Sequence, residues 1–261
     1  MPPGARQIIA GHFETSRQLA AKSVTSVIEQ ASAVRERLAP WGPREALVGV
    51  AMVAGGSVAL LATLAIVFRG TENTLSDTLV PVVLAVPHLL MVSAVWYLGI
   101  RKHRVPWSVV GFSPLKGRLA LLIPWPALLG SLVFSGVYVA IVTALGFDFL
   151  LPTGVPADIL GEGARRLVTI VLIGLAGPLA EELFFRGFIL TALVSPMGRL
   201  RAAVVASILF AAGHVDLGVM VPFFVSGMLL SWLYLRTRSI WPPFLAHAAQ
   251  NLLALWLMTA A

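Results

Sequence analysis

Two adjacent carboxylates and an arginine interrupt a long apolar stretch of this chain. Glu181, Glu182 and Arg186 lie in the segment EELFFRG, inside the apolar run from Leu167 to Val194. Each charge at membrane depth costs at least about 2.5–3.5 kcal/mol on insertion scales, so three of them indicate a function. Glu182 and Arg186 are four residues apart and can form an ion pair on one helix face. Glu181 points about 100° away around the helix axis, which leaves its carboxylate free for chemistry.

Two further polar patterns follow along the chain, in the segments FAAGH and HAAQN. Phe210 is four residues before His214 in the first, and His247 is four residues before Asn251 in the second. Each pair therefore shares one helix face. At about 1.5 Å per residue from the expected cytosolic ends, Glu181, His214 and Asn251 lie roughly 16–20 Å deep, and His247 roughly 10 Å. We predict that these side chains converge on one buried site.

A carboxylate, two imidazoles and an amide in one site can hydrolyse an amide bond. Glu181 with His214 could deprotonate a water as a general base. His247 and Asn251 could then donate hydrogen bonds to the oxyanion of the attacked amide. The same Glu181, His214 and His247 could instead hold a zinc ion with an open water position. The residue types do not separate these two mechanisms.

Several classes of hydrolase are excluded by missing residues. The chain contains no cysteine, which removes thiolate nucleophiles and thiolate metal ligands. It contains neither the GxSxG segment of serine hydrolases nor the HExxH segment of the commonest zinc proteases. The sequence therefore favours a mechanism without a cofactor, and zinc is the alternative.

Other polar residues of the apolar segments suit structural roles. His88, next to Pro87, is interpreted as a hydrogen-bond partner between helices. Phe210 is interpreted as a packing residue that supports the site, and Asp216 as an interfacial residue near the end of a span.

The composition predicts an integral membrane protein. Of 261 residues, 58% are hydrophobic and only 12% are charged, about half the charge of a soluble domain. Because a lipid-exposed backbone must satisfy its own hydrogen bonds, the class is a polytopic all-α bundle. The net charge of +7 is explained below by membrane topology, so no nucleic-acid partner is predicted.

About 20 apolar residues cross the hydrocarbon core, and this length predicts about seven transmembrane helices. The fourth is broken by Pro178, which favours a kink or a fresh helix start. The fifth is short and is expected to end inside the bilayer. The seven predicted spans are Ala46–Phe68, Leu79–Ile100, Leu119–Gly146, Leu167–Val194, Ala202–Leu217, Val219–Leu235 and Ile240–Ala260.

Residues 1–45 are predicted to form a separate amphipathic helix in the cytosol, before a bundle over residues 46–261. Apolar residues recur there at three- and four-residue steps, with basic and acidic residues between them. Such a helix could lie on the membrane surface or pack on the cytosolic end of the bundle.

The distribution of lysine and arginine predicts the orientation. With seven spans, the N-terminus shares a side with the loops after the second, fourth and sixth spans. That side carries fifteen of the nineteen basic residues, and the opposite side carries three. The positive-inside rule then puts the N-terminus in the cytosol and the C-terminus outside.

The three segments EELFFRG, FAAGH and HAAQN resemble the motifs EExxxR, FxxxH and HxxxN of the CPBP family, the CAAX proteases and bacteriocin-processing enzymes also called Abi proteins. The order of the motifs and their position in successive apolar spans match those of the family. The resemblance covers about residues 105–257, with the motifs confined to residues 181–251.

The resemblance implies an intramembrane endopeptidase that cleaves a membrane-anchored protein or peptide. It implies that Glu181 and His214 activate the water and that His247 and Asn251 stabilise the oxyanion. Glu182 and Arg186 would support the site. The family leaves both the metal and the substrate open, and the sequence indicates no oligomeric state.

The source and two competing functions complete the prediction. The Ala-, Val- and Arg-rich, Lys-poor composition suggests a bacterium with a GC-rich genome, and hence the bacterial inner membrane. The main alternative is a non-enzymatic protein of the same fold, either a bacteriocin self-immunity factor or a membrane scaffold. A small transporter with a carboxylate proton relay is disfavoured, because the chain shows no internal repeat.

Overall fold

The computed structural model describes residues 22–23, 39–69, 79–115, 117–153 and 157–260. By its internal contacts the chain divides into two units, Met1–Arg37 and Leu38–Ala261. Lys22 and Ser23 are the described residues of the first unit. The amphipathic helix predicted over residues 1–45 therefore lies largely outside the described residues.

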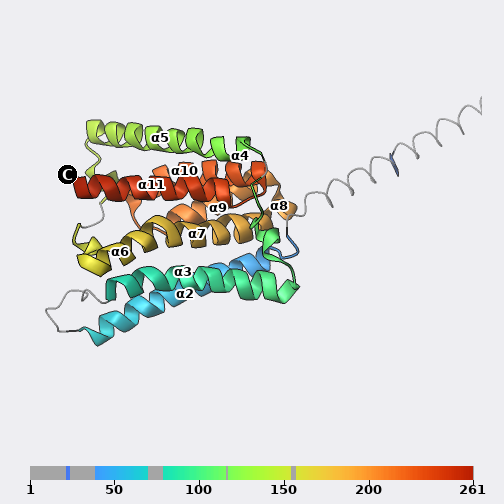
Figure 1. Cartoon of the computed structure of the whole chain (residues 1–261), viewed down its shortest axis with the longest axis horizontal. Helices are drawn as coiled ribbons and strands as arrows, with labels where there is room; N and C mark the ends of the chain where they lie inside the picture. Colours follow the sequence, from blue (N-terminus) through green and yellow to red (C-terminus); the bar gives the residue numbers. More distant parts are fainter. Residues whose placement is uncertain (1–21, 24–38, 70–78, 116, 154–156, 261) are drawn as a thin grey trace, which may run out of the picture. The chain divides into compact units, whose positions relative to one another are not determined.

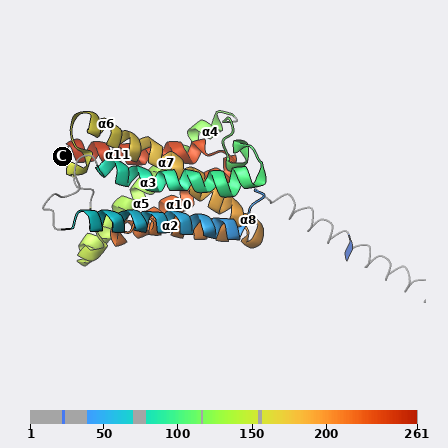
Figure 2. The same cartoon turned by 90° about the horizontal axis from the view of Figure 1, so that it is seen from below.

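Helices make up the second unit, and its described residues contain no strand (Figure 1). The first two long helices lie side by side in both views (Figures 1 and 2). The first three long helices are α2 (Pro43–Val67), α3 (Leu79–Ala94) with its π-helical continuation η1 (Val95–Arg101), and α5 (Pro124–Leu145). Four short helical turns connect the longer elements: η2 (Trp107–Val110), α4 (Leu119–Leu122), η3 (Asp148–Leu150) and η4 (Ala157–Leu160).

One long helix over residues 163–197, called the composite helix below, alternates α-helical and π-helical segments. Its segments are α6 (Gly163–Val171), η5 (Leu172–Ala176), α7 (Gly177–Glu181), η6 (Glu182–Leu190) and α8 (Thr191–Met197). Three helices follow it: α9 (Arg199–Ala212), α10 (Leu217–Thr237) and α11 (Trp241–Ala260). The described residues thus form seven long helices, and the predicted all-α class is confirmed.

Five of these helices are long and apolar enough to cross a membrane: Pro43–Val67, Leu79–Arg101, Ala120–Leu145, Gly163–Met197 and Leu217–Thr237. The other two predicted spans form helices that miss this standard. Helix α9 has 14 residues, which reach about 21 Å against the roughly 30 Å of the hydrocarbon core. Helix α11 has 20 residues, but His247, Gln250 and Asn251 dilute its apolar character. Both helices carry predicted site residues.

The composite helix is irregular on both sides of Glu181. Pro178 lies in the first turn of α7, directly after the π-helical segment η5. Of the two predicted alternatives, the fresh helix start is wrong, because Gly163–Met197 is one continuous helix. The irregularity is the π-helical segment η5 before Pro178, and Glu181 follows it. Glu181 ends α7, and the second π-helical segment begins at Glu182. Because each π turn adds a residue to the helical repeat, the two segments re-aim the side chains that the EELFFRG pattern carries.

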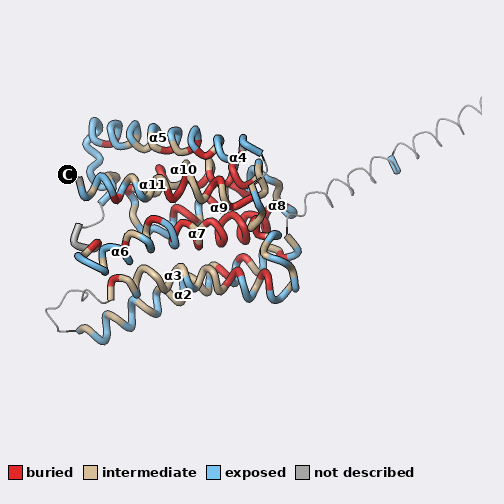
Figure 3. The backbone as a smooth tube through the Cα atoms, viewed as in Figure 1, coloured by how far each residue is buried: buried red, intermediate tan, exposed pale blue. Residues whose placement is uncertain are grey.

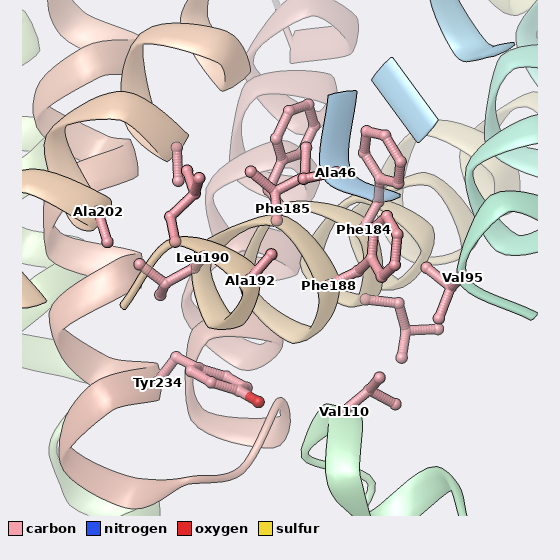
Figure 4. Close-up of a cluster of buried hydrophobic side chains, with 14 of the residues drawn as sticks. Ala46, Val95, Val110, Phe184, Phe185, Phe188, Leu190, Ala192, Ala202 and Tyr234 are labelled. Carbon is pink, nitrogen blue, oxygen red and sulfur yellow. The ribbon is translucent and has the colours of Figure 1, made fainter. Parts of the chain in front are cut away.

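The composite helix also forms the centre of the core. Figure 3 shows buried backbone concentrated along this helix and its neighbours. Every residue of η6 is buried, and Phe184 and Phe188 lie beside Val95 (Figure 4). The indole nitrogen of Trp41 donates to the backbone carbonyl of Phe188 at 3.0 Å. The η6 segment, which carries Glu182 and Arg186, is thus packed on all sides.

Asp216 lies at the start of α10, where it acts as the N-cap. One carboxylate oxygen accepts from the backbone N–H of Gly218 at 2.8 Å. The other accepts from the hydroxyl of Thr153 at 2.8 Å and from its backbone N–H at 3.1 Å. These hydrogen bonds, those of Thr153 first, hold the pKa of Asp216 below its ordinary value. Asp216 therefore ties the loop after η3 to α10 and caps that helix.

Candidate functional site

Glu182 is the centre of a buried charge network. Its Oε1 accepts from Nη1 of Arg186 at 2.7 Å and from Nδ1 of His247 at 2.9 Å. Glu182 and Arg186 are both 0% exposed, so the pair is shielded from solvent. The predicted i,i+4 ion pair is present, and the structure adds a third member from α11.

Arg186 also contacts two other helices. Its Nη2 donates to the backbone carbonyl of Gly227 in α10 at 3.4 Å, and its guanidinium lies 4.5 Å from the ring centroid of Phe210 in α9. A cation over an aromatic face is favourable where water is excluded. Arg186 therefore fastens the composite helix to α9 and α10, while Glu182 fastens it to α11.

Glu181 faces the opposite way, toward α3. Its Oε1 lies 3.2 Å from Nε2 of His88. Its Oε2 is buried and has no hydrogen-bond partner among the described residues, and it lies 3.7 Å from Nε2 of His247. One carboxylate oxygen is thus engaged by a histidine, and the other is unbonded near a second histidine.

His88 is the residue that sequence reasoning placed outside the site. The structure confirms that His88 contacts another helix, because its ring bridges α3 and the composite helix. Its partner, however, is Glu181. A signal was present in the sequence: His88 is 12 residues from Ile100, the cytosolic end of its predicted span. This spacing corresponds to roughly 18 Å of depth, the depth estimated for Glu181 and His214.

His214 lies just after the end of α9. Its Nδ1 is 2.9 Å from the backbone carbonyl oxygen of Phe210, and a carbonyl can only accept, so this nitrogen carries a proton. In the neutral ring, Nε2 is then the acceptor. The ring meets Phe223 edge-on, with the centroids 4.4 Å apart.

Phe210 lies between the two histidines that were predicted to take part in catalysis. Its ring centroid is 5.1 Å from that of His214 and 5.5 Å from that of His247, and both contacts are edge-on. The face of the same ring contacts the guanidinium of Arg186. Phe210 is 2% exposed, and it supports three functional side chains at once.

The amide of Asn251 is partly committed to the backbone. Its Nδ2 donates to the carbonyl of Ile173 at 2.9 Å, inside the π-helical segment η5. The second N–H of the amide remains for another acceptor. Asn251 therefore holds the irregular backbone that precedes Glu181, in addition to any role toward a substrate.

A cavity of about 430 Å³ collects the predicted site residues. Glu181, His214, His247 and Asn251 all line it, as does Phe210. Glu182 and Arg186 do not line it and lie behind His247. His88, to which the sequence analysis gave a structural role, also lines the cavity, as does Gln250, which it did not single out. The remaining lining is mainly apolar: Leu84, Pro87, Met91, Ile159, Ile173, Gly177, Phe185, Gly213, Phe223, Ser226, Ala254, Leu255 and Met258.

The zinc alternative would use Glu181, His214 and His247 as ligands. Among the described residues, no three His, Asp or Glu side chains are grouped as a metal site. Glu181 directs Oε1 to His88, and its Oε2 lies 3.7 Å from Nε2 of His247. Two ligands about 2 Å from one tetrahedral ion lie roughly 3.4 Å apart, so this separation fits a shared hydrogen-bonded molecule and a shared ion equally.

Comparison with known proteins identifies the site-bearing region. Residues 163–253 match the family model of the type II CAAX prenyl endopeptidase Rce1-like proteins. This segment is narrower than the predicted resemblance over residues 105–257, but it contains all three motifs. His88 lies outside it.

Three bacterial proteins are among the relatives that match the chain, and two of them are described as membrane peptidases or proteases. A putative membrane peptidase, YdiL of Bacillus subtilis (strain 168), is 33% identical over 82 residues, 31% of this chain and 34% of that protein. The membrane-embedded CAAX protease MroQ of Staphylococcus aureus (strain USA300) is 26% identical over 158 residues, 58% of this chain and 57% of that protein. The UPF0177 protein YxdF of Lactococcus lactis subsp. lactis (strain IL1403) is 25% identical over 166 residues, 63% of this chain and 87% of that protein.

The chain thus spans about a third of the length of YdiL and just over half of the length of MroQ. No solved structure matches it significantly. The family resemblance carried by the three motifs is confirmed over residues 163–253.

Proposed function

We propose that this chain, an Rce1-like (CPBP-family) membrane protein over residues 163–253, is an intramembrane endopeptidase that hydrolyses a peptide bond of a membrane-associated protein or peptide. One observation carries the proposal. Glu181, His214, His247 and Asn251 come from three separate helical regions and line one cavity of about 430 Å³. If these four side chains only stabilised contacts between helices, they would not need to line the same cavity.

Glu181 and His214 activate the water in this proposal. The Oε2 atom of Glu181 is unbonded among the described residues, so it can accept a proton from a water molecule. His214 donates at Nδ1 to the carbonyl of Phe210, which makes Nε2 the basic nitrogen of the neutral ring. The water oxygen attacks the carbonyl carbon of the substrate while its proton passes to one of these two bases.

His247 and Asn251 stabilise the oxyanion that forms. Because His247 already donates at Nδ1 to Glu182, it can donate at Nε2 only when the ring carries both protons. Asn251 contributes the N–H that Ile173 does not use. The proton taken from the water is then delivered to the leaving nitrogen, the C–N bond breaks, and a carboxylic acid and an amine are released.

Glu182 and Arg186 act through His247 rather than on the substrate. Glu182 fixes the tautomer and the orientation of the His247 ring, as a carboxylate does for a catalytic histidine in many hydrolases. Arg186 neutralises Glu182 at 2.7 Å, so the buried carboxylate does not stand alone. The support predicted for these two residues thus consists of ring orientation and charge balance.

The remaining proposals concern topology and location. We infer that α9 and α11 complete a seven-helix bundle with the five candidate spans, since neighbouring helices cover their polar residues. The basic residues gather on the side of the N-terminus, so the N-terminus is assigned to the cytosol of a bacterial inner membrane. We propose that residues 1–45 form a cytosolic segment before the bundle over residues 46–261. The end of this segment joins the bundle, because Trp41 donates to Phe188 and α2 begins at Pro43.

Comparative proteomics of bacterial membranes tests the proposed activity. Membranes of cells that express the wild type or Glu181→Ala are compared for new N- and C-termini of membrane proteins. The matched control is Glu162→Ala, which removes an exposed carboxylate that makes no side-chain cap at the start of α6. Termini that appear with the wild type and the control but not with Glu181→Ala support an endopeptidase. Identical termini in all three samples favour a non-enzymatic immunity or scaffold protein.

A further inference from the structure

We infer that His88 is a positioning residue for Glu181, so that the candidate active site is completed by α3, outside the family-matched segment. The inference deepens the proposed function and rests on it for its catalytic consequence. Its structural part, a hydrogen bond between His88 and Glu181, stands on the geometry alone.

The hydrogen bonds of His88 fix the direction of its ring. Its Nδ1 lies 2.6 Å from the carbonyl oxygen of Leu84, one helical turn earlier. A carbonyl only accepts, so Nδ1 carries a proton and the ring cannot rotate without losing this bond. Nε2 is thereby aimed at Oε1 of Glu181, 3.2 Å away. Because a carboxylate only accepts, Nε2 is the donor in this contact, and the ring then carries a proton on both nitrogens.

This contact decides which oxygen of Glu181 faces the reaction. Because His88 occupies Oε1, the carboxylate plane is held with Oε2 toward His247, at 3.7 Å from its Nε2. A carboxylate with one oxygen tethered loses rotational freedom, and a base held in one geometry transfers a proton more efficiently. His88 does not need to touch the substrate to have this effect.

Gly177 provides the space that the contact requires. It lies four residues before Glu181, on the same helix face. A Cβ atom at Gly177 would approach Nε2 of His88 to 2.9 Å and the backbone oxygen of Leu172 to 2.8 Å. Separations this small force a shift of the neighbours. The absence of a side chain at Gly177 thus leaves room for the imidazole of His88 to reach Glu181.

Nitrogen NMR of the purified full-length protein tests the hydrogen bond without any substrate. The protein is labelled with 15N-histidine, and the His88 signals are identified by their loss in His88→Gln. We expect Glu181→Gln to shift the Nε2 signal of His88, while Glu162→Ala leaves it unchanged. A His88 signal that is the same in the wild type and Glu181→Gln overturns the inference.

Kinetics test the catalytic consequence on a fluorogenic peptide that carries the cleavage sequence found by proteomics. In His88→Leu, we expect kcat to fall about 10- to 100-fold, the effect of losing one hydrogen bond to a charged group, with KM unchanged. His88→Gln keeps a donor near the position of Nε2 and should recover most of kcat. Gly177→Ala should lower kcat in the same direction, and Gly55→Ala, whose Cβ would meet no atom within 4 Å, should not.

The outcomes separate the inference from the proposed function. A His88→Leu protein that melts at a lower temperature but keeps the wild-type kcat shows a structural helix contact and overturns positioning. A shifted His88 signal in a protein that cleaves no membrane protein supports the hydrogen bond and contradicts the endopeptidase assignment.

Discussion

Helix α2 and the composite helix are both long and apolar, yet they occupy opposite environments. Within their most apolar stretches, 6% of α2 and 44% of the composite helix is buried inside the protein. Helix α2 presents Leu61 and Ile66 outward, where lipid can cover them. The composite helix carries Glu181, Glu182 and Arg186, with partners from the surrounding helices.

The difference shows why the buried acidic and basic side chains of the described residues, Glu182 and Arg186, lie on the composite helix. A carboxylate on the outward face of α2 would meet lipid, which offers no hydrogen bonds. On the composite helix each charge meets a donor, an acceptor or an aromatic face supplied by α3, α9, α10 or α11. Both helices qualify as membrane spans by their mean hydropathy. They differ in whether neighbouring helices supply partners for charged side chains.

The largest expected loss of activity comes from replacing Glu181 in the composite helix. Glu181→Gln removes the proposed base, so activity should fall about 10²- to 10⁴-fold, the range typical of general-base catalysis. Folding should be nearly unchanged, because glutamine has a similar volume and can still bond to His88. Peptide cleavage and thermal melting of the same purified sample check both parts. Residual activity within tenfold of the wild type would contradict the role of Glu181.

Arg186→Ala should produce the opposite pattern. Its loss leaves Glu182 buried with only His247 as a partner, and breaking a buried ion pair typically costs about 3–5 kcal/mol. We therefore expect less folded protein and a lower melting temperature in detergent. Equal folded yield and equal melting of Arg186→Ala and Glu181→Gln would contradict this division of labour.

A double variant sharpens the distinction between the two carboxylates. Replacing both members of a buried pair by apolar residues is often neutral for stability. Glu182→Leu combined with Arg186→Met should therefore melt closer to the wild type than Arg186→Ala does. It should remain inactive, because Nδ1 of His247 loses its acceptor. Recovery of activity together with stability would show that Glu182 does not orient His247.

Paired leucine truncations test the comparison between the helices without touching charge. Leu190 in the composite helix is 0% exposed, and Leu61 in α2 is 55% exposed. Leu190→Ala should destabilise by about 2–5 kcal/mol through loss of contacts and a residual cavity. Leu61→Ala should change stability by less than about 0.5 kcal/mol. Thermal melting of both proteins in the same detergent measures the difference, and equal losses would mean that α2 is packed rather than exposed.

The sequence predicted the residues that line the cavity better than the contacts that hold them. Glu181, His214, His247 and Asn251 were found because polar residues stand out in apolar spans, and their common depth indicated convergence. His88 has the same signal, but it lacked a spaced partner on its own helix and so was interpreted as a structural contact. The link from Glu182 to His247 joins residues 65 positions apart, and no local spacing encodes it.

The number of spans was predicted only in part for a related reason. Helix α11 contains His247, Gln250 and Asn251, and α9 has only 14 residues and ends just before His214. Length and apolarity therefore identify four other helices and the composite helix, whose long apolar flanks outweigh its charged segment. Hydropathy misses the two remaining helices, which lie next to the chemistry.

The smallest expected effect is that of metal removal. Glu181 is engaged by His88, and the described residues contain no group of three metal-ligating side chains. We therefore expect peptide cleavage to persist after exhaustive dialysis against a chelator, with the metal content of each sample measured alongside its rate. His247→Gln should then weaken the transition state by the few kcal/mol typical of one oxyanion donor, without changing metal content. Activity lost on chelation and restored by one equivalent of zinc would instead make Glu181, His214 and His247 ligands, with the unbonded Oε2 of Glu181 as the ligand atom.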